Sequence, residues 1–379
     1  MIHIKAYAQE LITVIKNSLN HSEVNIKVSD WSDLVKFAKT HGMTMCLFNY
    51  AESLPANLKP DNDIMMTLKK EASILIFQGL QQKYAVSEMQ QAFESNNIYN
   101  MALKGAVTKE RYSDSFFRSM GDIDILYKAE QSNELKKTMQ SLKYSDFREG
   151  RKNDTYFRKP CISVEMHREM VSAKSDYYQY YKNIWNKATV KDKCLYTYEL
   201  SIEDELIFNI VHLAEHFKEG GAGIRFVVDV FVYGSFEMNC QYLESELSKL
   251  NLLNFYHNIR ALAEFWFGNG KSSELTDKLA DYILSGGVFG TEENAAALSV
   301  KNGRVSFLIK TSFPIYEDMC SMFPWLKKRK ILLPLAWAVR GCRALLYRRK
   351  NVIGQLKRAK HGNIEKGTEL TELYSECGL

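Results

Sequence analysis

The sequence changes its periodicity near residue 98, and this change limits the folds that the chain can adopt. Before that point, apolar residues recur every three or four positions, most clearly over residues 64–97, which is typical of amphipathic helices. Beyond it, short runs of alternating side chains end in Gly turns, which is typical of strands. Such a chain has to pack a small sheet against helices.

The strand-like part has a definite order of elements. Strand, helix, strand, helix, strand and strand are predicted at 98–105, 106–113, 121–128, 132–144, 155–159 and 161–169. The strands are interrupted by helices and are few. We therefore predict an α+β fold, in which a small mixed β-sheet forms a core embedded in a mainly helical chain.

The periodicity divides the chain into four predicted regions. They are a helical region at 1–95, an α/β core at 96–198, a helical domain at 199–300 and a basic C-terminal region at 301–379 with weaker periodicity. Asp30, Asp61 and Ser201 precede helical stretches and are expected to cap them.

The composition is that of an ordinary globular protein, with 46% hydrophobic and 25% charged residues. The N-terminal twenty residues lack a basic stretch followed by an apolar one, so no signal peptide is predicted. No run of 18 apolar residues predicts a transmembrane helix. The seven cysteines form no CxxC pair, which favours reduced thiols, a cytoplasmic location and no zinc site built from Cys.

The net charge of +5 hides a strongly basic segment. Residues 327–360 contain twelve Lys or Arg and no Asp or Glu, which leaves about −7 for the rest of the chain. This segment predicts a contact with nucleic acid or with an anionic membrane surface, where Trp337 in its apolar stretch could anchor a peripheral protein. A solvated helix with basic ends is the alternative.

The predicted chemistry centres on paired carboxylates. Asp122 and Asp124 are two residues apart on a predicted strand, so they lie on the same side and repel each other unless a cation lies between them. Glu165 lies on a later predicted strand. If the two strands are neighbours, the three carboxylates share one surface and can bind Mg²⁺, with Mn²⁺ as the alternative ion.

A phosphate site is predicted beside these acids. Lys104 and Gly105 lie where a strand runs into a helix, so Gly105 permits close approach of the backbone and Lys104 can pair with phosphate oxygens. Arg118, four residues before Asp122, is a second candidate ligand, with an ion pair to Asp114 or Asp122 as its alternative.

Three further features leave alternatives open. His167 has the strand parity of Glu165, so it either borders the site or packs at the strand end. His212 and His216 have an i, i+4 spacing that serves either a metal or, more simply, the structure. Arg225 and Asp229 are also four residues apart and form a helix ion pair or line an acceptor pocket.

These motifs resemble the uncharacterised nucleotidyltransferase family of the DNA polymerase β-like superfamily. The resemblance rests on LKG at 103–105, RYSDSFFRSMGDIDIL at 111–126 and SVEMH at 163–167, and it extends to FPWLKKRKILLPLAWAVR at 323–340. It implies metal-dependent transfer of a nucleoside monophosphate from an NTP donor to an acceptor. Asp122 and Asp124 match the metal-binding acids, and Glu165 matches the third acid, as a metal ligand or a base.

The resemblance has one departure and two rivals. The wider superfamily has Gly-Ser at the phosphate-binding turn, whereas this chain has Lys104-Gly105-Ala106.

The acceptor can be a small molecule, a protein or an RNA end. A metal-dependent DxD glycosyltransferase is one rival, but it would need a larger Rossmann-like domain before the motif. A non-catalytic nucleotide-binding protein with the same fold is the other.

Overall fold

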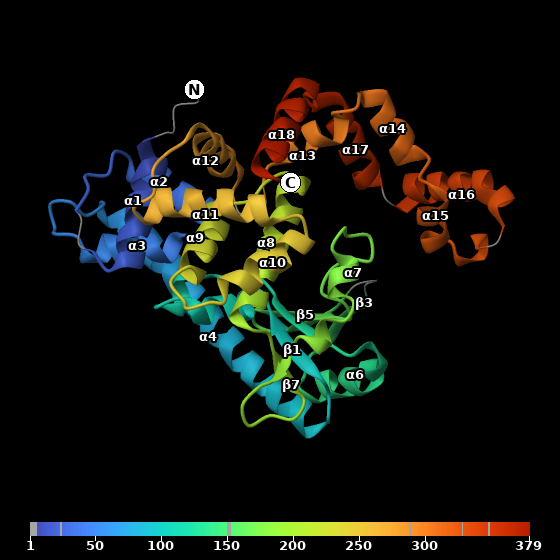
Figure 1. The fold of residues 1–379 in the computed structure, drawn as a ribbon, viewed down its shortest axis with the longest axis horizontal. Helices are drawn as coiled ribbons and strands as arrows, with labels where there is room; N and C mark the ends of the chain where they lie inside the picture. The colour runs from blue at the N-terminus through green and yellow to red at the C-terminus, as the bar shows by residue number, and fades with distance from the viewer. Residues whose placement is uncertain (1–5, 23–24, 150–152, 288–289, 328, 348) are drawn as a thin grey trace.

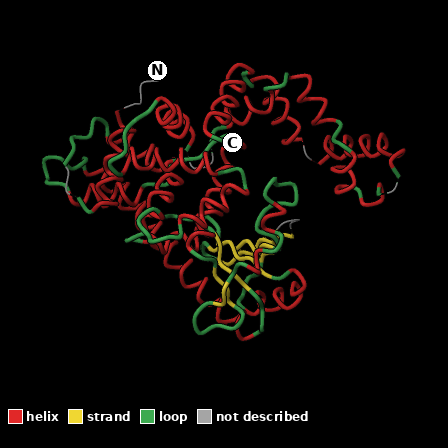
Figure 2. Tube along the Cα trace, in the orientation of Figure 1, coloured by secondary structure: helices red, strands yellow, loops and turns green. Residues whose placement is uncertain are grey.

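The computed structural model describes residues 6–22, 25–149, 153–287, 290–327, 329–347 and 349–379. Its strands form one small block, with helices around and above it (Figures 1 and 2). Three parts of the predictions lie outside the described residues. They are residues 1–5 of the segment tested for a signal peptide, and Lys328 and Arg348 of the basic segment.

Among the described residues, four helices precede the sheet, in the region predicted to be helical. They are α1 (Ala6–Asn20), α2 (Trp31–Thr40), α3 (Thr44–Ser53) and the long α4 (Asn62–Ser95). The side chains of Asp30 and Asp61 accept hydrogen bonds from the backbone N–H groups of Asp33 and Ile64, which confirms both predicted caps.

The α/β core contains one seven-stranded mixed sheet, which confirms the predicted fold class. Its order is β3-β4-β5-β2-β1-β7-β6. The strands are β1 (Asn100–Leu103), β2 (Ile123–Tyr127), β3 (Asp146–Glu149), β4 (Asn153–Arg158), β5 (Ile162–His167), β6 (Thr189–Val190) and β7 (Thr197–Glu199). The central strand β2 pairs antiparallel with β1 and parallel with β5.

The prediction missed three of these strands, β3, β6 and β7. The last two are only two and three residues long, too short for a periodic signal. A contact distant in sequence fixes β7 instead. The carboxylate of Glu94 accepts hydrogen bonds from the backbone N–H groups of Leu195, Tyr196 and Thr197, at 3.0, 3.0 and 2.6 Å.

The two faces of β2 belong to different cores. Ile123, Ile125 and Tyr127 pack with residues of α4 and of α6 (Ser132–Ser141). Leu126 belongs to the larger core that the helical parts of the chain share. Because side chains alternate along a strand, Asp124 lies on the same face as Leu126, towards the helical part.

The helices after the sheet begin with α8 (Ile202–Glu219), capped by Ser201, whose side chain accepts from Asp204 N–H. The helices α9 (Ile224–Tyr233), α10 (Cys240–Lys249), α11 (Leu253–Phe267) and α12 (Glu274–Gly286) follow. Together with α1–α3 they form the larger core.

The chain after α12 is also helical, although its periodicity beyond residue 300 is weak. The helices are α13 (Glu292–Val300), α14 (Arg304–Ser312), α15 (Tyr316–Met322), α16 (Leu333–Tyr347), α17 (Arg349–His361) and α18 (Ile364–Cys377). The polar C-terminal segment forms α18, where Tyr374 is buried and hydrogen-bonds Tyr282 at 2.7 Å. In Figure 1 the helices α14–α17 extend as an arm. Among the described residues, none of the helices is long and apolar enough to cross a membrane.

His41 predicts a loss of stability in mild acid. It is 1% exposed, and its Nδ1 accepts a hydrogen bond from Ile224 N–H at 3.3 Å. Burial lowers the pKa of His41 from 6.5 to about 4, against a backbone hydrogen bond with Leu284 that raises it. His41 therefore takes up a proton at a higher pH in the unfolded chain than in the folded protein. As a result, the free energy of unfolding falls by about 3 kcal/mol as the pH falls from 6.5 to about 4.

Urea unfolding between pH 7 and about pH 4 measures this effect. We expect the His41→Gln variant to lose less stability than the wild type over this interval, by about 3 kcal/mol. Equal losses in the two proteins would contradict the assignment to His41.

Candidate active site

The predicted acids meet where β2 and β5 run side by side. Asp124 pairs with Glu165 in the parallel register of these strands, and Leu103 pairs with Asp124 in the antiparallel register of β1 and β2. Lys104, the next residue after Leu103, therefore enters the same place. The predicted proximity of Asp124 and Glu165 is confirmed.

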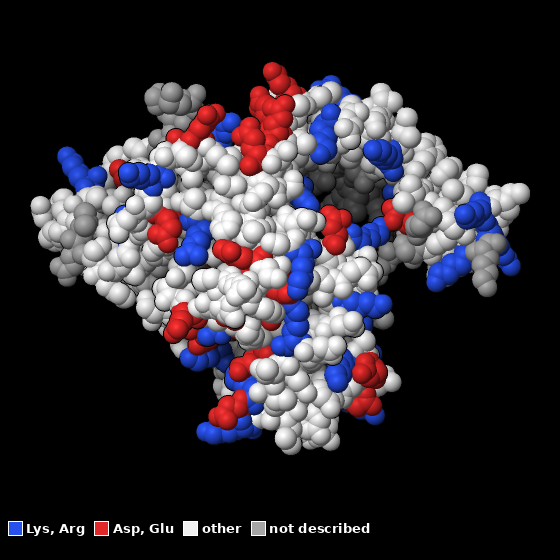
Figure 3. All heavy atoms as spheres, viewed as in Figure 1, with Lys and Arg blue, Asp and Glu red and all other residues white. Residues whose placement is uncertain are grey.

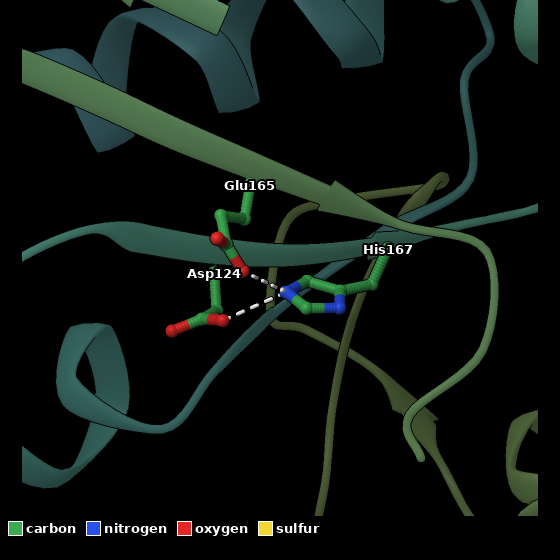
Figure 4. Close-up of side chains that lie close together, drawn as sticks. All are labelled: Asp124, Glu165 and His167. Atoms are coloured by element: carbon green, nitrogen blue, oxygen red, sulfur yellow. Dashed lines mark hydrogen bonds and ion pairs between the residues drawn. The ribbon is translucent and has the colours of Figure 1, made fainter. Parts of the chain in front are cut away.

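Asp124 is the centre of the site. It is 8% exposed, and its Oδ1 accepts hydrogen bonds from Lys104 Nζ and from His167 Nε2, both at 2.7 Å. His167 Nε2 also lies 3.4 Å from Oε2 of Glu165. Figure 4 shows the imidazole ring of His167 directed at both carboxylates. The histidine thus holds the two acids together.

These contacts keep both carboxylates ionised. Burial opposes the ionisation of Asp124, but the hydrogen bond from His167 and the charge of Lys104 outweigh it and hold the pKa of Asp124 well below its usual range. The hydrogen bond from His167 also lowers the pKa of Glu165, against burial and the charge of Asp124. Two negative charges are therefore retained side by side at neutral pH.

Asp122 differs from its neighbour in the motif. It precedes β2 and is exposed, and it is not part of the group formed by Asp124, Glu165 and His167. The ligand atoms of that group lie within 4.8 Å of one another. Asp122 thus lies at the exposed rim of the site, and the structure does not bring it together with the other two acids.

The Lys-Gly turn has an unusual backbone. Lys104 has φ +48° and ψ −125°, a region that non-Gly residues rarely adopt. Such a conformation costs about 1–3 kcal/mol and is found mainly at functional sites. The helix that follows, α5 (Gly105–Thr108), is a single turn. Lys104 is therefore held in place by the surrounding structure rather than by a long helix.

Gly105 is required by close packing. A Cβ atom at this position would lie 2.8 Å from Cβ of Met120 and 3.3 Å from its sulfur. We expect Gly105→Ala to displace the turn and to destabilise the protein by about 1–3 kcal/mol. A thermal melt of the two proteins measures this loss. Equal stability of the wild type and Gly105→Ala would contradict the packing argument.

Arg118 forms an ion pair with Asp229 of α9. Its Nε donates to Oδ1 and Oδ2 of Asp229 at 2.8 and 3.1 Å, and its Nη1 donates to the Ser119 carbonyl at 2.7 Å. Tyr112 donates a hydrogen bond of 2.6 Å to the same Asp229. The ion pairs predicted for these residues are therefore wrong, because Arg118 pairs with neither Asp114 nor Asp122, and Asp229 pairs with Arg118 rather than with Arg225.

Arg225 has fewer partners. Its Nη1 donates to the Ser119 carbonyl at 3.3 Å, and its buried Nε has no hydrogen-bond partner among the described residues. Burial and the charge of Arg118 lower the pKa of Arg225 to about 9. Burial and the charges of Lys104 and Arg225 lower the pKa of His216 to about 4. The site therefore has a strongly cationic side next to its acidic one.

The two histidines of α8 contact each other. Nε2 of His212 and Nε2 of His216 are 3.1 Å apart, and both rings pack near Phe226. Neither belongs to a metal-ligand group of three among the described residues. This arrangement supports the structural alternative.

A cavity adjoins the Lys-Gly turn. It has a volume of about 340 Å³ and lies between α4, α5, β7 and α8. Buried polar groups form one wall, where Arg111 pairs with Glu205 at 2.7 Å and the hydroxyl of Tyr233 donates to Glu205 at 2.9 Å. The cavity is in the size range of small-ligand sites.

Comparison with known proteins agrees with this geometry. A family model described as an uncharacterised nucleotidyltransferase matches residues 27–268, which include the sheet and the helices that pack on it. The chain belongs to this family. No curated protein and no solved structure matches the chain.

The residues of this site fit a divalent cation. Two ionised carboxylates converge, and carboxylate oxygen atoms are the ligands that Mg²⁺ and Mn²⁺ prefer. Asp124 and Glu165 would hold the ion, with Asp122 at the rim. In this structure Lys104 provides the positive charge beside Asp124, so binding of a metal requires the ammonium group to move away from Oδ1.

Sequence reasoning did not assign the contact of His167 with both acids. His167 lies two residues after Glu165 on the same strand, so both side chains are on the same face of the sheet. This spacing could have indicated the contact, but it also fits a histidine that packs at the strand end. The roles of Lys104, Gly105 and Arg118 at a phosphate stay predictions.

Proposed function

We propose that this nucleotidyltransferase moves a nucleoside monophosphate from an NTP to a hydroxyl or phosphate oxygen of an acceptor, and that it requires a divalent cation. The observation that carries the proposal is the register of β2 and β5, which places ionised Asp124 beside ionised Glu165. An acceptor oxygen attacks the α-phosphorus of the NTP. The bond between this phosphorus and the oxygen that bridges the α- and β-phosphates breaks, and pyrophosphate leaves with the electron pair of that bond.

The roles of the acidic residues follow from their charges. Asp124 and Glu165 would hold Mg²⁺ or Mn²⁺, which neutralises charge on the transferring phosphoryl group. His167 donates through Nε2 to both carboxylates, so it positions them. Because the lowered pKa of Glu165 makes it a weak base, the geometry favours its role as a ligand over its role as the base.

The cationic side of the site suits the triphosphate. Lys104 lies 2.7 Å from Asp124 and can exchange this carboxylate for a phosphate oxygen when a metal takes its place. Arg225 is close to the same loop and has donor capacity left at Nε. Arg118 is bound to Asp229, and its direct contact with phosphate would break a buried ion pair. We therefore propose Lys104 and Arg225 as the phosphate ligands and Arg118 as a residue that positions the loop.

A transfer assay tests the proposal. Each NTP, labelled at its α-phosphate, is incubated with the protein, Mg²⁺ or Mn²⁺, and fractions of a cell extract that contain small molecules, proteins or RNA. We expect one fraction to gain label with release of pyrophosphate, and Glu165→Gln to abolish the transfer. Equal labelling by wild type and Glu165→Gln would overturn the assignment of the site.

The rival functions have less support. The described residues before β1 form helices and no strand, so the large Rossmann-like domain of a DxD glycosyltransferase is not found there. A non-catalytic nucleotide-binding protein would give no labelled product in this assay, although it would bind NTP in a separate titration.

A further inference from the structure

The C-terminal arm exposes an unusual number of apolar side chains. Eleven of the twenty large apolar residues that the described chain exposes lie between residues 305 and 356. Single exposed apolar residues are normal, but a concentration of them marks an interaction surface. The arm contains α14–α17, which project beside the body of the protein (Figure 1).

The exposed residues follow the helical period. Along α16 and the turn before it, Ile331, Leu335, Ala338, Cys342 and Leu346 are all exposed and are spaced by three or four residues. The relative exposures of Ile331, Leu335 and Leu346 are 89%, 55% and 65%. On α14, Val305, Ile309 and Phe313 follow each other at intervals of four. These helices therefore present apolar stripes to the outside.

These stripes are not the inner faces of the arm. The arm has its own small core, made of Met319, Phe323, Leu326 and Ala336. Trp337 packs against this core, and its indole N–H donates to the Pro314 carbonyl at 2.9 Å. Because α16 already buries one apolar face, its second apolar face is available to a partner.

Positive charges surround the exposed stripe. Among the described residues of 327–360, Lys327, Arg329, Lys330, Arg343 and Lys357 are exposed, and this segment contains no Asp or Glu. At the outer end of the arm in Figure 3, the coloured side chains on this face are Lys and Arg. A surface that is both aliphatic and basic matches an anionic lipid headgroup layer over acyl chains.

We propose that the arm binds the surface of an anionic phospholipid membrane, with α14 and α16 lying in the interface. Apart from Phe313 and Trp325, the exposed apolar side chains of the arm are not aromatic. This favours lipid over single-stranded nucleic acid, because sites for single strands stack bases on aromatic groups and Ile, Leu and Val offer no such surface. This inference does not depend on nucleotidyl transfer.

The arm also contacts the α/β core, since Lys174, in the segment after β5, forms an ion pair with Asp318 of α15.

Vesicle sedimentation tests the proposal. The full chain is mixed with vesicles of phosphatidylcholine alone or of phosphatidylcholine with an equal amount of phosphatidylglycerol. We expect binding to the anionic vesicles only, and weaker binding as the salt concentration rises. The triple variant Ile331→Asp/Leu335→Asp/Leu346→Asp should lose affinity by more than about tenfold.

Two further variants make the result decisive. Met66→Asp/Leu80→Asp changes exposed apolar residues of α4, at 64% and 52%, and should leave binding unchanged. Lys327→Ser/Arg329→Ser/Lys357→Ser keeps the apolar stripe and should weaken binding to the anionic vesicles. Binding that is absent, or equal in the wild type and the aspartate triple variant, would overturn the proposal. Binding of a single-stranded RNA oligonucleotide without any binding of vesicles would assign the arm to nucleic acid instead.

Discussion

Replacing Asp124 by Asn is expected to lower the rate of nucleotide transfer by about 10³-fold. The amide has the shape of the carboxylate and can still accept hydrogen bonds from Lys104 and His167, but it carries no charge to hold a cation. The rate of label transfer, measured with the acceptor fraction identified above, reports this change. The variant also leaves Lys104 without its counter-charge, so some loss of stability is expected. A thermal melt has to show that the variant is folded at the assay temperature, and the lower rate then reports lost chemistry rather than lost structure.

Asp192→Asn is the matched control for this variant. Its side chain is 88% exposed and pairs only loosely with Lys193, at 3.8 Å. We expect it to transfer nucleotide at the wild-type rate. An active Asp124→Asn variant would remove Asp124 from the reaction and with it the proposed cation site.

Replacing Asp229 by Asn is expected to destabilise the protein by about 3–5 kcal/mol, the largest effect on stability that the structure predicts. The side chains of Asp229 and Arg118 are 3% and 6% exposed, so the substitution leaves a buried guanidinium without its counter-charge. It also removes the charged acceptor of Tyr112. Urea unfolding of the two proteins measures the loss.

The double variant Arg118→Met/Asp229→Leu tests the reason for this effect. It removes both charges together, so we expect it to be more stable than Asp229→Asn alone. A loss below about 1 kcal/mol in Asp229→Asn would show that the pair is not as desolvated as the structure indicates.

The local features of the site could be predicted from the sequence because they depend on short-range geometry. The two-residue period of a strand places Asp124 on the same face as Leu126, and the same period puts Glu165 and His167 together on β5. The caps at Asp30, Asp61 and Ser201 depend on one hydrogen bond within three residues. Each of these predictions needed only the immediate neighbours along the chain.

The rest depends on contacts between distant residues. Arg118 meets Asp229 across 111 positions, so the i, i+4 spacing of Arg225 and Asp229 was misleading. Glu94 holds β7 across about a hundred positions, and nothing in the three residues of that strand indicates this. The exposure of Asp122 was equally hidden, because strand parity gives the side of a residue but not how deeply it lies.

Calorimetric titration with each NTP, with and without Mg²⁺, tests the central claim most directly. Asp124 and Glu165 are claimed to bind a divalent cation together with the triphosphate. We therefore expect at least one NTP to bind the wild type only when Mg²⁺ or Mn²⁺ is present, and not to bind the Asp122→Asn/Asp124→Asn variant. Binding that is independent of the metal, or equal in the wild type and the double variant, would contradict the claim.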